Sequence, residues 1–254
     1  MKNILGILLA LFNASIIMAQ TSTDSKTSCG ACDVLPGQVE KFKSALSESK
    51  LHFYTDGGTN KLDLKKAEEE CNVKYFSVCN DMLILTSTGE KKDRTELRQK
   101  KKLSLNDYSS MYYEAIISNT PKDNEKKGVT IGQIHNSAEG VKRPLLRVEI
   151  TGSGEIRAVV TDSYIKGEGE VENDLVVPFN DGDKITCKIV IKDSEDEIEV
   201  EVVNKTNGSK KELTYTVSEL WKEKDGEFYF KAGAYTQVTG PETIVIYNEF
   251  KYEY

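Results

Sequence analysis

Short runs in which apolar and polar residues alternate dominate the chain after residue 80. A period of two is typical of a strand with one buried and one wet face, and turn residues such as Gly152-Ser153-Gly154 and Asn207-Gly208-Ser209 separate the runs. The predicted strands span residues 81–86, 112–118, 130–135, 145–150, 156–161, 185–191, 198–203, 212–217, 227–235 and 243–254. Such a succession of short strands predicts an all-β fold, an antiparallel sandwich or barrel.

The first 80 residues follow a different pattern. Within residues 36–50, a helix would place Val39, Phe42, Ala45 and Leu46 on one face, which predicts a short helical segment before the strands. Residues 61–71 are highly charged, and we expect a further helical turn or two there. The sequence contains no internal repeat, so we expect these elements and the strands to form one domain.

The N-terminus has the composition of a secretory signal peptide. Lys2 precedes an apolar run over residues 4–12, and Ala19 precedes Gln20 at the expected cleavage position. The apolar run is too short to span a bilayer comfortably. We therefore expect a signal peptide at residues 1–19, a leader at 20–35 and the folded domain at 36–254, secreted to an extracellular or periplasmic space and without a membrane partner after cleavage.

The five cysteines fit export but leave their pairing open. Cys29 and Cys32 are close together, whereas Cys71 and Cys79 are eight residues apart, a spacing that is poor for a four-cysteine zinc site. We expect one or two disulfides among these four residues. Cys187 lies in an apolar run and is expected to be a buried, unreactive thiol.

The charge balance limits the possible partners. The chain has 34 Lys and Arg residues against 41 Asp and Glu residues, a formal charge of −7, and only 2 His residues. This argues against a nucleic-acid binder, which would carry a basic surface, and a histidine-rich metal site cannot be assembled. Residues 91–102 nevertheless hold seven Lys or Arg and two acidic residues, a basic patch that would steer a polyanion to one face. For Lys100, Lys101 and Lys102, the alternative is a solvated loop outside the site.

Three segments share an unusual arrangement of side chains. If each is a strand, its apolar residues lie on one face and its long polar residues on the other. The polar faces hold Arg94, Glu96 and Arg98, then Gln133 and His135, and finally Tyr229, Lys231, Tyr235 and Gln237. An ordinary solvated face would not collect arginine, histidine and tyrosine in this way. If the three strands are neighbours, they line one cationic groove that contains an acid–base pair.

These segments resemble a known family. Residues 94–98, 133–135 and 229–237 closely resemble, in the same order, three sequence blocks of the alginate lyases of polysaccharide lyase family 7. The resemblance covers about residues 70–254. It implies a concanavalin-like β-jelly roll, a sandwich of two antiparallel sheets with the substrate in a concave groove. It also implies action on the anionic polysaccharide alginate without a metal or organic cofactor. We expect the catalytic domain to span residues 36–254 and to act as a monomer, although the three blocks leave residues 21–70 unexplained.

The reaction implied by the resemblance is β-elimination, in which a base removes the C5 proton of a uronate and the 4-linked sugar leaves. The dianion that forms is poorly stabilised unless hydrogen-bond donors neutralise the carboxylate. The resemblance gives that role to Arg94, Gln133 and His135. It assigns Tyr235 as the acid, and also as the base where the proton and the leaving group lie on the same side. His135 is the base where they lie on opposite faces.

The other residues of the three blocks are expected to bind substrate. Lys231 is expected to lower the pKa of Tyr235 and to bind the sugar acid. The remaining residues are expected to hold neighbouring sugars or to lock Arg94 in place, and they are Glu96, Arg98, Tyr229 and Gln237. Ile134, between Gln133 and His135, resembles the subgroup that favours guluronate-containing blocks, and we expect endo action. His52 is expected to be structural.

Three rival functions stay open at this point. The alternating Glu197, Glu199 and Glu201 are spaced as a retaining glycoside hydrolase requires, although they lie in a hairpin that indicates an outer edge. A non-catalytic carbohydrate-binding module would use similar cations and aromatic rings. A lyase for another polyuronate, such as glucuronan, would use the same chemistry.

Overall fold

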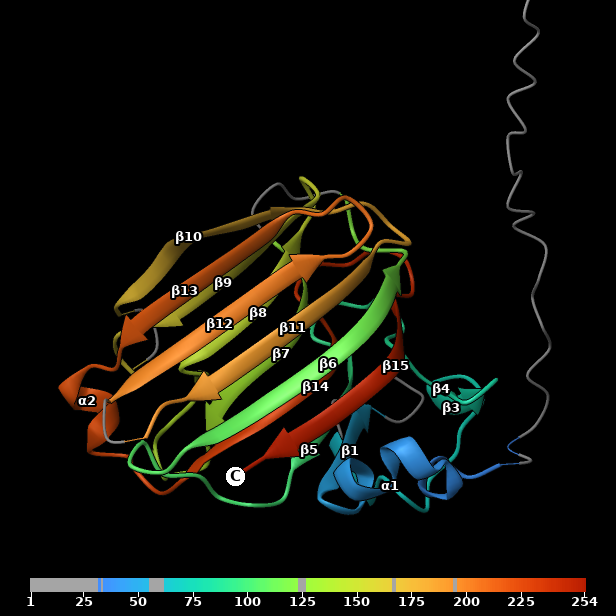
Figure 1. The fold of residues 1–254 in the computed structure, drawn as a ribbon, viewed down its shortest axis with the longest axis horizontal. Helices are drawn as coiled ribbons and strands as arrows, with labels where there is room; N and C mark the ends of the chain where they lie inside the picture. The colour runs from blue at the N-terminus through green and yellow to red at the C-terminus, as the bar shows by residue number, and fades with distance from the viewer. Residues whose placement is uncertain (1–31, 33, 55–61, 123–126, 166–167, 194–195) are drawn as a thin grey trace, which may run out of the picture.

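Because apolar and polar residues alternate along each strand, every strand has one apolar face. These faces are buried between two stacked antiparallel sheets (Figure 1). The computed structural model describes residues 32, 34–54, 62–122, 127–165, 168–193 and 196–254. The larger sheet has eight strands, in the order β10 (Glu170–Pro178), β9 (Glu155–Thr161), β8 (Leu146–Thr151), β7 (Gly128–Asn136), β14 (Phe228–Thr236), β5 (Arg94–Gln99), β1 (Ser49–Tyr54) and β2 (Leu62–Lys66). The smaller sheet has seven, in the order β13 (Lys210–Thr216), β12 (Glu197–Asn204), β11 (Lys184–Ile191), β6 (Ser109–Ser118), β15 (Ile244–Glu253), β4 (Met82–Thr86) and β3 (Phe76–Cys79). The predicted all-β jelly-roll sandwich is confirmed.

The core lies between the two sheets. Ile134 of β7 and Phe230 of β14 point into it from the larger sheet, and both are fully buried. Tyr113 of β6 and Tyr247 of β15 enter from the smaller sheet, with ring centroids 5.3 Å apart in an edge-to-face arrangement. The Tyr113 hydroxyl donates to the Ile131 carbonyl oxygen at 3.1 Å, which links the two sheets. Burying each such side chain contributes about 2 kcal/mol, and this burial fixes which face of each strand turns outward.

The predicted strands are present, and the structure adds others. The ten predicted runs correspond to β4, β6, β7, β8, β9, β11, β12, β13, β14 and β15, and the polar segment after Asp93 is β5. The helical turn expected within residues 61–71 is wrong for residues 62–66. These form β2, because they pair with β1 in an antiparallel register that sets Lys66 opposite Lys50. β10 was not predicted, because a register shift between Glu172 and Val176 interrupts the alternation of apolar and polar residues along the strand.

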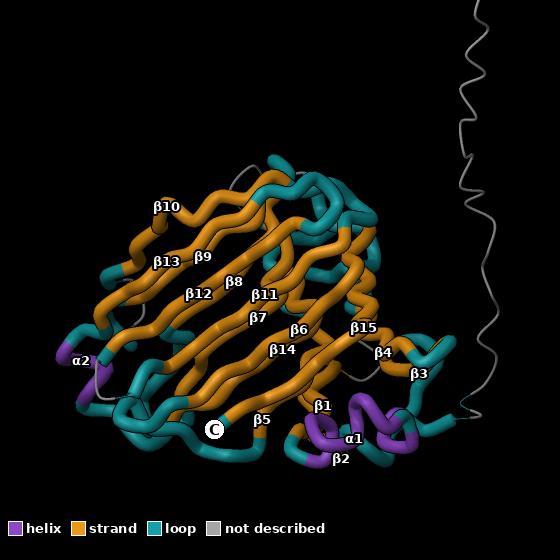
Figure 2. Tube along the Cα trace, viewed as in Figure 1, coloured by secondary structure: helices purple, strands orange, loops and turns teal. Residues whose placement is uncertain are grey.

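The helices lie at the margins of the sandwich (Figure 2). The predicted N-terminal helical segment consists of the 3-10 turn η1 (Pro36–Gln38) and the helix α1 (Glu40–Ser47), and α2 (Glu219–Lys222) connects β13 to β14. Val39, Phe42, Ala45 and Leu46 are buried, as the predicted apolar face requires. The helix ends at Ser47, so the range predicted for it extends too far toward the C-terminus.

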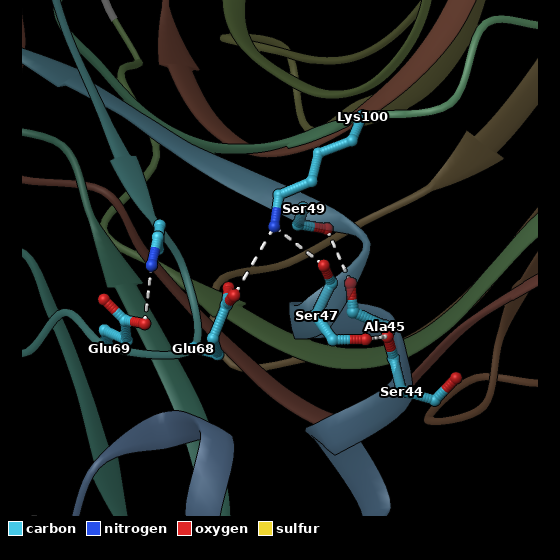
Figure 3. Close-up of polar contacts among 8 residues, drawn as sticks. Ser44, Ala45, Ser47, Ser49, Glu68, Glu69 and Lys100 are labelled. Carbon is cyan, nitrogen blue, oxygen red and sulfur yellow. Dashed lines mark hydrogen bonds and ion pairs between the residues drawn. The ribbon is translucent and has the colours of Figure 1, made fainter.

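Hydrogen bonds fasten this helix to the end of β5 (Figure 3). Lys100 donates from Nζ to the Ser47 carbonyl oxygen at 2.7 Å and lies 3.4 Å from Glu68 Oε1. Ser49 Oγ donates to the Ala45 carbonyl oxygen at 2.8 Å. The segment before residue 70 therefore belongs to the sandwich, where it adds β1 and β2 to the larger sheet.

The cysteines support the expectation of disulfides in the N-terminal third. Cys32 and Cys71 form a disulfide, and Cys79 is also disulfide-bonded, whereas Cys29 lies outside the described residues. Cys187 is a free, buried thiol, and burial raises its pKa to about 12. Within the described ranges, no helix is long and apolar enough to cross a membrane. The predicted signal peptide, residues 1–19, lies outside the described residues.

Candidate active site

The three polar segments lie side by side in the larger sheet. β14 is flanked by β5 on one side and by β7 on the other, so the hypothesis of neighbouring strands is confirmed. The register pairs their polar residues: Arg94 with Tyr235, Arg98 with Lys231, Gln133 with Lys231, and His135 with Tyr229. Directly paired residues point to the same face of a sheet. These side chains therefore share the face opposite the core, here called the polar face.

Gly233 allows β5 and β14 to approach closely in the middle of this face. It pairs with Glu96 and has a φ of +149°, in the region that favours glycine. A Cβ atom at this position would lie 2.2 Å from the Thr95 carbonyl oxygen and 2.7 Å from Glu96 Cα. Any larger residue would push apart the two strands that carry Arg94 and Tyr235.

Glu96 is the centre of a buried polar network. Its Oε1 atom accepts a hydrogen bond from Gln133 Nε2, and its Oε2 atom accepts one from Lys231 Nζ. Arg94 Nη1 lies 3.7 Å from Oε2. The side chains of Glu96 and Lys231 are each only 1% exposed. One carboxylate thus orients donors that come from three adjacent strands.

Burial and neighbouring charges act on the lysine of this network. The pKa of Lys231 is lowered to about 8, mainly by burial; Arg94 and Arg98 act in the same direction, and Glu96 opposes the shift. Lys231 and Glu96 can stay buried together because the hydrogen bond between them compensates the loss of hydration. Arg94, Arg98 and Lys231 supply three cations to one anion here, which gives the polar face the charge needed to attract a carboxylate.

Aromatic rings support the two arginines. The Arg94 guanidinium carbon lies 3.8 Å from the centroid of the Tyr235 ring, and that of Arg98 lies 4.3 Å from the centroid of Tyr229. The Tyr229 ring also stacks on His135, with centroids 5.5 Å apart and planes 15° from parallel. Cation–π contacts of this kind fix planar donors without using their N–H groups. The rings therefore hold the planes of the two guanidinium groups in place on the polar face.

His135 is set up as a neutral imidazole. Burial lowers its pKa to about 4, and the charge of Lys231 adds to the effect. Its Nδ1 atom lies 2.9 Å from the Asn136 carbonyl oxygen and 2.8 Å from the Asn136 amide nitrogen. In the tautomer with the proton on Nδ1, that oxygen accepts the hydrogen bond and Nε2 keeps the lone pair that a base requires. The Asn136 side chain is itself held by a 2.8 Å hydrogen bond to the Lys224 carbonyl oxygen.

Gln237 lies at the end of the polar face, just after β14. Its Nε2 atom donates to Thr130 Oγ1 at 2.9 Å, and Thr130 pairs with Tyr235 across β7 and β14. The structure thus places it beside Tyr235 and away from Arg98.

His52 also belongs to the polar face, although the sequence pattern did not place it there. His52 lies in β1, directly opposite Glu96, and is 6% exposed. Burial acts on its imidazole together with the charges of Lys231, Arg94 and Arg98. The signal was available, because Lys50 and His52 alternate with Leu51 and Phe53 as polar and apolar residues do in the other three segments.

The polar face also continues past β7. Arg147 of β8 pairs with Gln133, and its Nε atom lies 2.8 Å from Glu149 Oε1. Arg157 of β9 lies 3.7 Å from the other oxygen of Glu149. The strand was predicted, but its polar residues were not recognised as an extension of the groove.

Other candidates from the sequence lie elsewhere. Glu197 and Glu201 lie on β12 of the smaller sheet. Glu197 is 3.4 Å from the Lys192 ammonium, and Glu201 forms an ion pair with Lys210. A hydrolase site built on these glutamates is therefore not supported. Lys101 covers the ring of Tyr254, its Nζ atom 3.6 Å from the centroid. Among the described residues, no three His, Cys, Asp or Glu side chains lie together as metal ligands would.

Comparison with known proteins identifies similar chains. A family model described as "Alginate lyase" matches residues 54–253. The alginate lyase AlyC3 is 20% identical with a TM-score of 0.69, over 86% of this chain and 94% of that one. Alginate lyase A1-II', a member of polysaccharide lyase family 7, is 19% identical with a TM-score of 0.67, over 87% and 98%. The alginate lyase from Klebsiella pneumoniae is 16% identical with a TM-score of 0.68, over 87% and 99%.

Two further results complete the comparison. AlyC3 is also known in complex with dimannuronate, and that chain is 18% identical to this one with a TM-score of 0.69, over 86% of this chain and 93% of that one. The curated protein sequences contain no match. At these identities, the solved structures establish the jelly-roll fold.

Proposed function

Since the chain belongs to the alginate lyase family by its match over residues 54–253, it is a polysaccharide lyase, and we propose that it is a secreted, endo-acting enzyme that favours guluronate-containing blocks of alginate. Cleavage proceeds by β-elimination and leaves an unsaturated uronate at the new non-reducing end. One observation carries the assignment of the site. Glu96 binds Gln133 and Lys231 from β7 and β14 while Arg94 lies beside it, so donors from three strands converge on one place.

In this proposal, Arg94, Gln133 and His135 hold the carboxylate of the uronate that is cleaved. Glu96 accepts a hydrogen bond from the Gln133 amide and so holds that amide where it can turn to the carboxylate of the uronate. Arg94 is positioned by the Tyr235 ring and by Glu96, and a planar guanidinium suits a carboxylate because it can bind both oxygens at once. Neutralising this carboxylate lowers the energy of the dianion that forms when the C5 proton leaves.

Tyr235 protonates the leaving oxygen and, where the C5 proton lies on the same side, also removes that proton. His135 removes the proton when it lies on the opposite face. A neutral imidazole is the form that can accept a proton, and the low pKa of His135 keeps it in that form at neutral pH. Neither step requires a metal or an organic cofactor.

The remaining predicted residues fall into two groups. Arg98, Tyr229 and Gln237 are proposed to bind neighbouring sugars. Glu96 and Lys231 are buried and bonded to each other, which favours a role in orienting Arg94 and Gln133. Of the two roles expected for Glu96, holding a sugar or locking Arg94, the buried position favours the second.

The cellular setting is also part of the proposal. The N-terminal composition favours export, and the disulfides fit an oxidising compartment. We propose that the mature enzyme acts as a monomer on the anionic polysaccharide, outside the cytoplasm and without a nucleic-acid or membrane partner.

The test is to incubate the purified chain with polyguluronate, polymannuronate and glucuronan in parallel. The proposal expects ultraviolet absorbance from unsaturated uronates, strongest on polyguluronate, with oligosaccharides of several lengths appearing early. New reducing ends without that absorbance would indicate a hydrolase. Retention on the polymer without products would indicate a binding module, and activity confined to glucuronan would move the enzyme to another polyuronate.

A further inference from the structure

His52 is a buried imidazole beside the network of Glu96. It lies in β1 at the position paired with Glu96, so both side chains are on the polar face. Only 6% of the residue is exposed, and neither Nδ1 nor Nε2 has a hydrogen-bond partner in the part of the chain that the structure describes. Nearly all buried polar groups in proteins are paired, so an imidazole with two unpaired nitrogens needs an explanation.

The surrounding charges determine which form of the ring is present. Burial lowers its pKa, and the charges of Lys231, Arg94 and Arg98 act in the same direction, so that the pKa is about 2. The ring is therefore neutral at physiological pH, with one N–H donor and one lone pair. The carboxylate of Glu96 lies at the paired position of β5.

The donors that now satisfy Glu96 are those that the proposed reaction requires elsewhere. Gln133 donates to Oε1, and Arg94 lies 3.7 Å from Oε2. A uronate carboxylate in the groove competes with Glu96 for both of them. When they turn toward the substrate, the buried carboxylate loses part of its compensation unless another donor replaces them.

We propose that His52 is that donor, a positioning residue whose ring N–H binds Glu96 once a uronate carboxylate engages Arg94 and Gln133. This inference rests on the proposed function. The ring N–H, which has no partner among the described residues, then donates to Glu96, and Glu96 stays fixed while its other donors move. His52 does not contact the sugar in this role.

Two substitutions separate this role from simple packing. His52→Phe keeps an aromatic ring but removes the donor, and His52→Asn restores an N–H. We expect His52→Phe to fold as stably as the natural chain, because it removes an unpaired buried group, while kcat falls about tenfold and KM changes little. His52→Asn should recover most of kcat. Unchanged kcat in His52→Phe, or equal losses in both variants, would overturn the inference.

A second measurement does not depend on the variants keeping their fold. The chain has only 2 His residues, so ring nitrogen resonances are readily assigned. When a guluronate oligosaccharide is added to the Tyr235→Phe protein, the resonance of the protonated His52 ring nitrogen should shift, as expected for a new hydrogen bond to a carboxylate. A His135 signal that responds while His52 does not would overturn the inference. Lack of any unsaturated product from the natural chain would instead refute the proposed function, and this inference with it.

Discussion

Lys231 donates a hydrogen bond to Glu96 inside the sheet, and each side chain is only 1% exposed. Removing one partner of such a pair leaves an uncompensated buried charge. The pair therefore couples the stability of β5 and β14 to the positions of Arg94 and Gln133.

The first prediction concerns this ion pair. Glu96→Gln should lower the free energy of unfolding by about 3–5 kcal/mol, because Lys231 keeps its charge and loses its counter-ion. The double variant with Lys231→Met should recover much of that loss. Urea unfolding of the two single variants and the double variant measures the coupling. Additive effects of the two substitutions would show that the pair does not contribute as a unit.

The second prediction concerns the proton-transfer residues. Tyr235→Phe and His135→Ala should each lower kcat on alginate at least about 100-fold, since each removes a group proposed to carry a proton. Both residues are half-buried on the polar face, so unfolding transitions should stay close to that of the natural chain. Lys101→Ala is the matched control, because Lys101 covers Tyr254 and is exposed; its activity should be nearly unchanged. Full activity in Tyr235→Phe would remove the proposed mechanism.

The sequence predicts much of this site because strand alternation is a local property. Knowing only that Arg94, Glu96 and Arg98 share a face, and that Gln133 and His135 share another, one can anticipate two polar strand faces. That the faces adjoin depends on sheet order, which brings together residues more than 100 positions apart. The resemblance supplied that order.

The position of His52 beside Glu96 could not be predicted from the sequence alone. β1 is short and follows directly after a helix, so its alternation alone did not single it out. Its partner Glu96 is 44 residues away, and only the register of β1 against β5 shows that they face each other. β2 was likewise mistaken for a helical turn, because its pairing with β1 overrides its local charge pattern.

The third prediction concerns acid stability. The pKa of His135 is lowered from 6.5 to about 4 and that of His52 to about 2, mainly by burial. Protons therefore bind preferentially to the unfolded chain, so stability is fully present above pH 6.5 and falls as the pH drops below it. Each histidine removes up to about 1.4 kcal/mol per pH unit until its folded pKa is reached.

The measurement is a set of urea unfolding curves between pH 7 and pH 5. The carboxylates contribute to the same curves, so the comparison is between the natural chain and His52→Phe. The variant should lose less stability over this interval, because it lacks one of the two neutral imidazoles. Identical pH dependence in the two proteins would contradict the burial of His52 as a neutral group.

The last prediction concerns the close approach of β5 and β14. Gly233→Ala should destabilise the protein by about 3 kcal/mol and lower kcat, because the added Cβ would meet the Thr95 carbonyl oxygen at 2.2 Å in a backbone conformation with a φ of +149°. Gly208→Ala is the control, since Gly208 has a φ of +78° but nothing within 4 Å of the added atom. It should cost only about 1 kcal/mol of backbone strain and leave kcat unchanged. If both variants lose the same stability and keep full activity, the spacing of the two strands does not set the geometry of Arg94 and Tyr235.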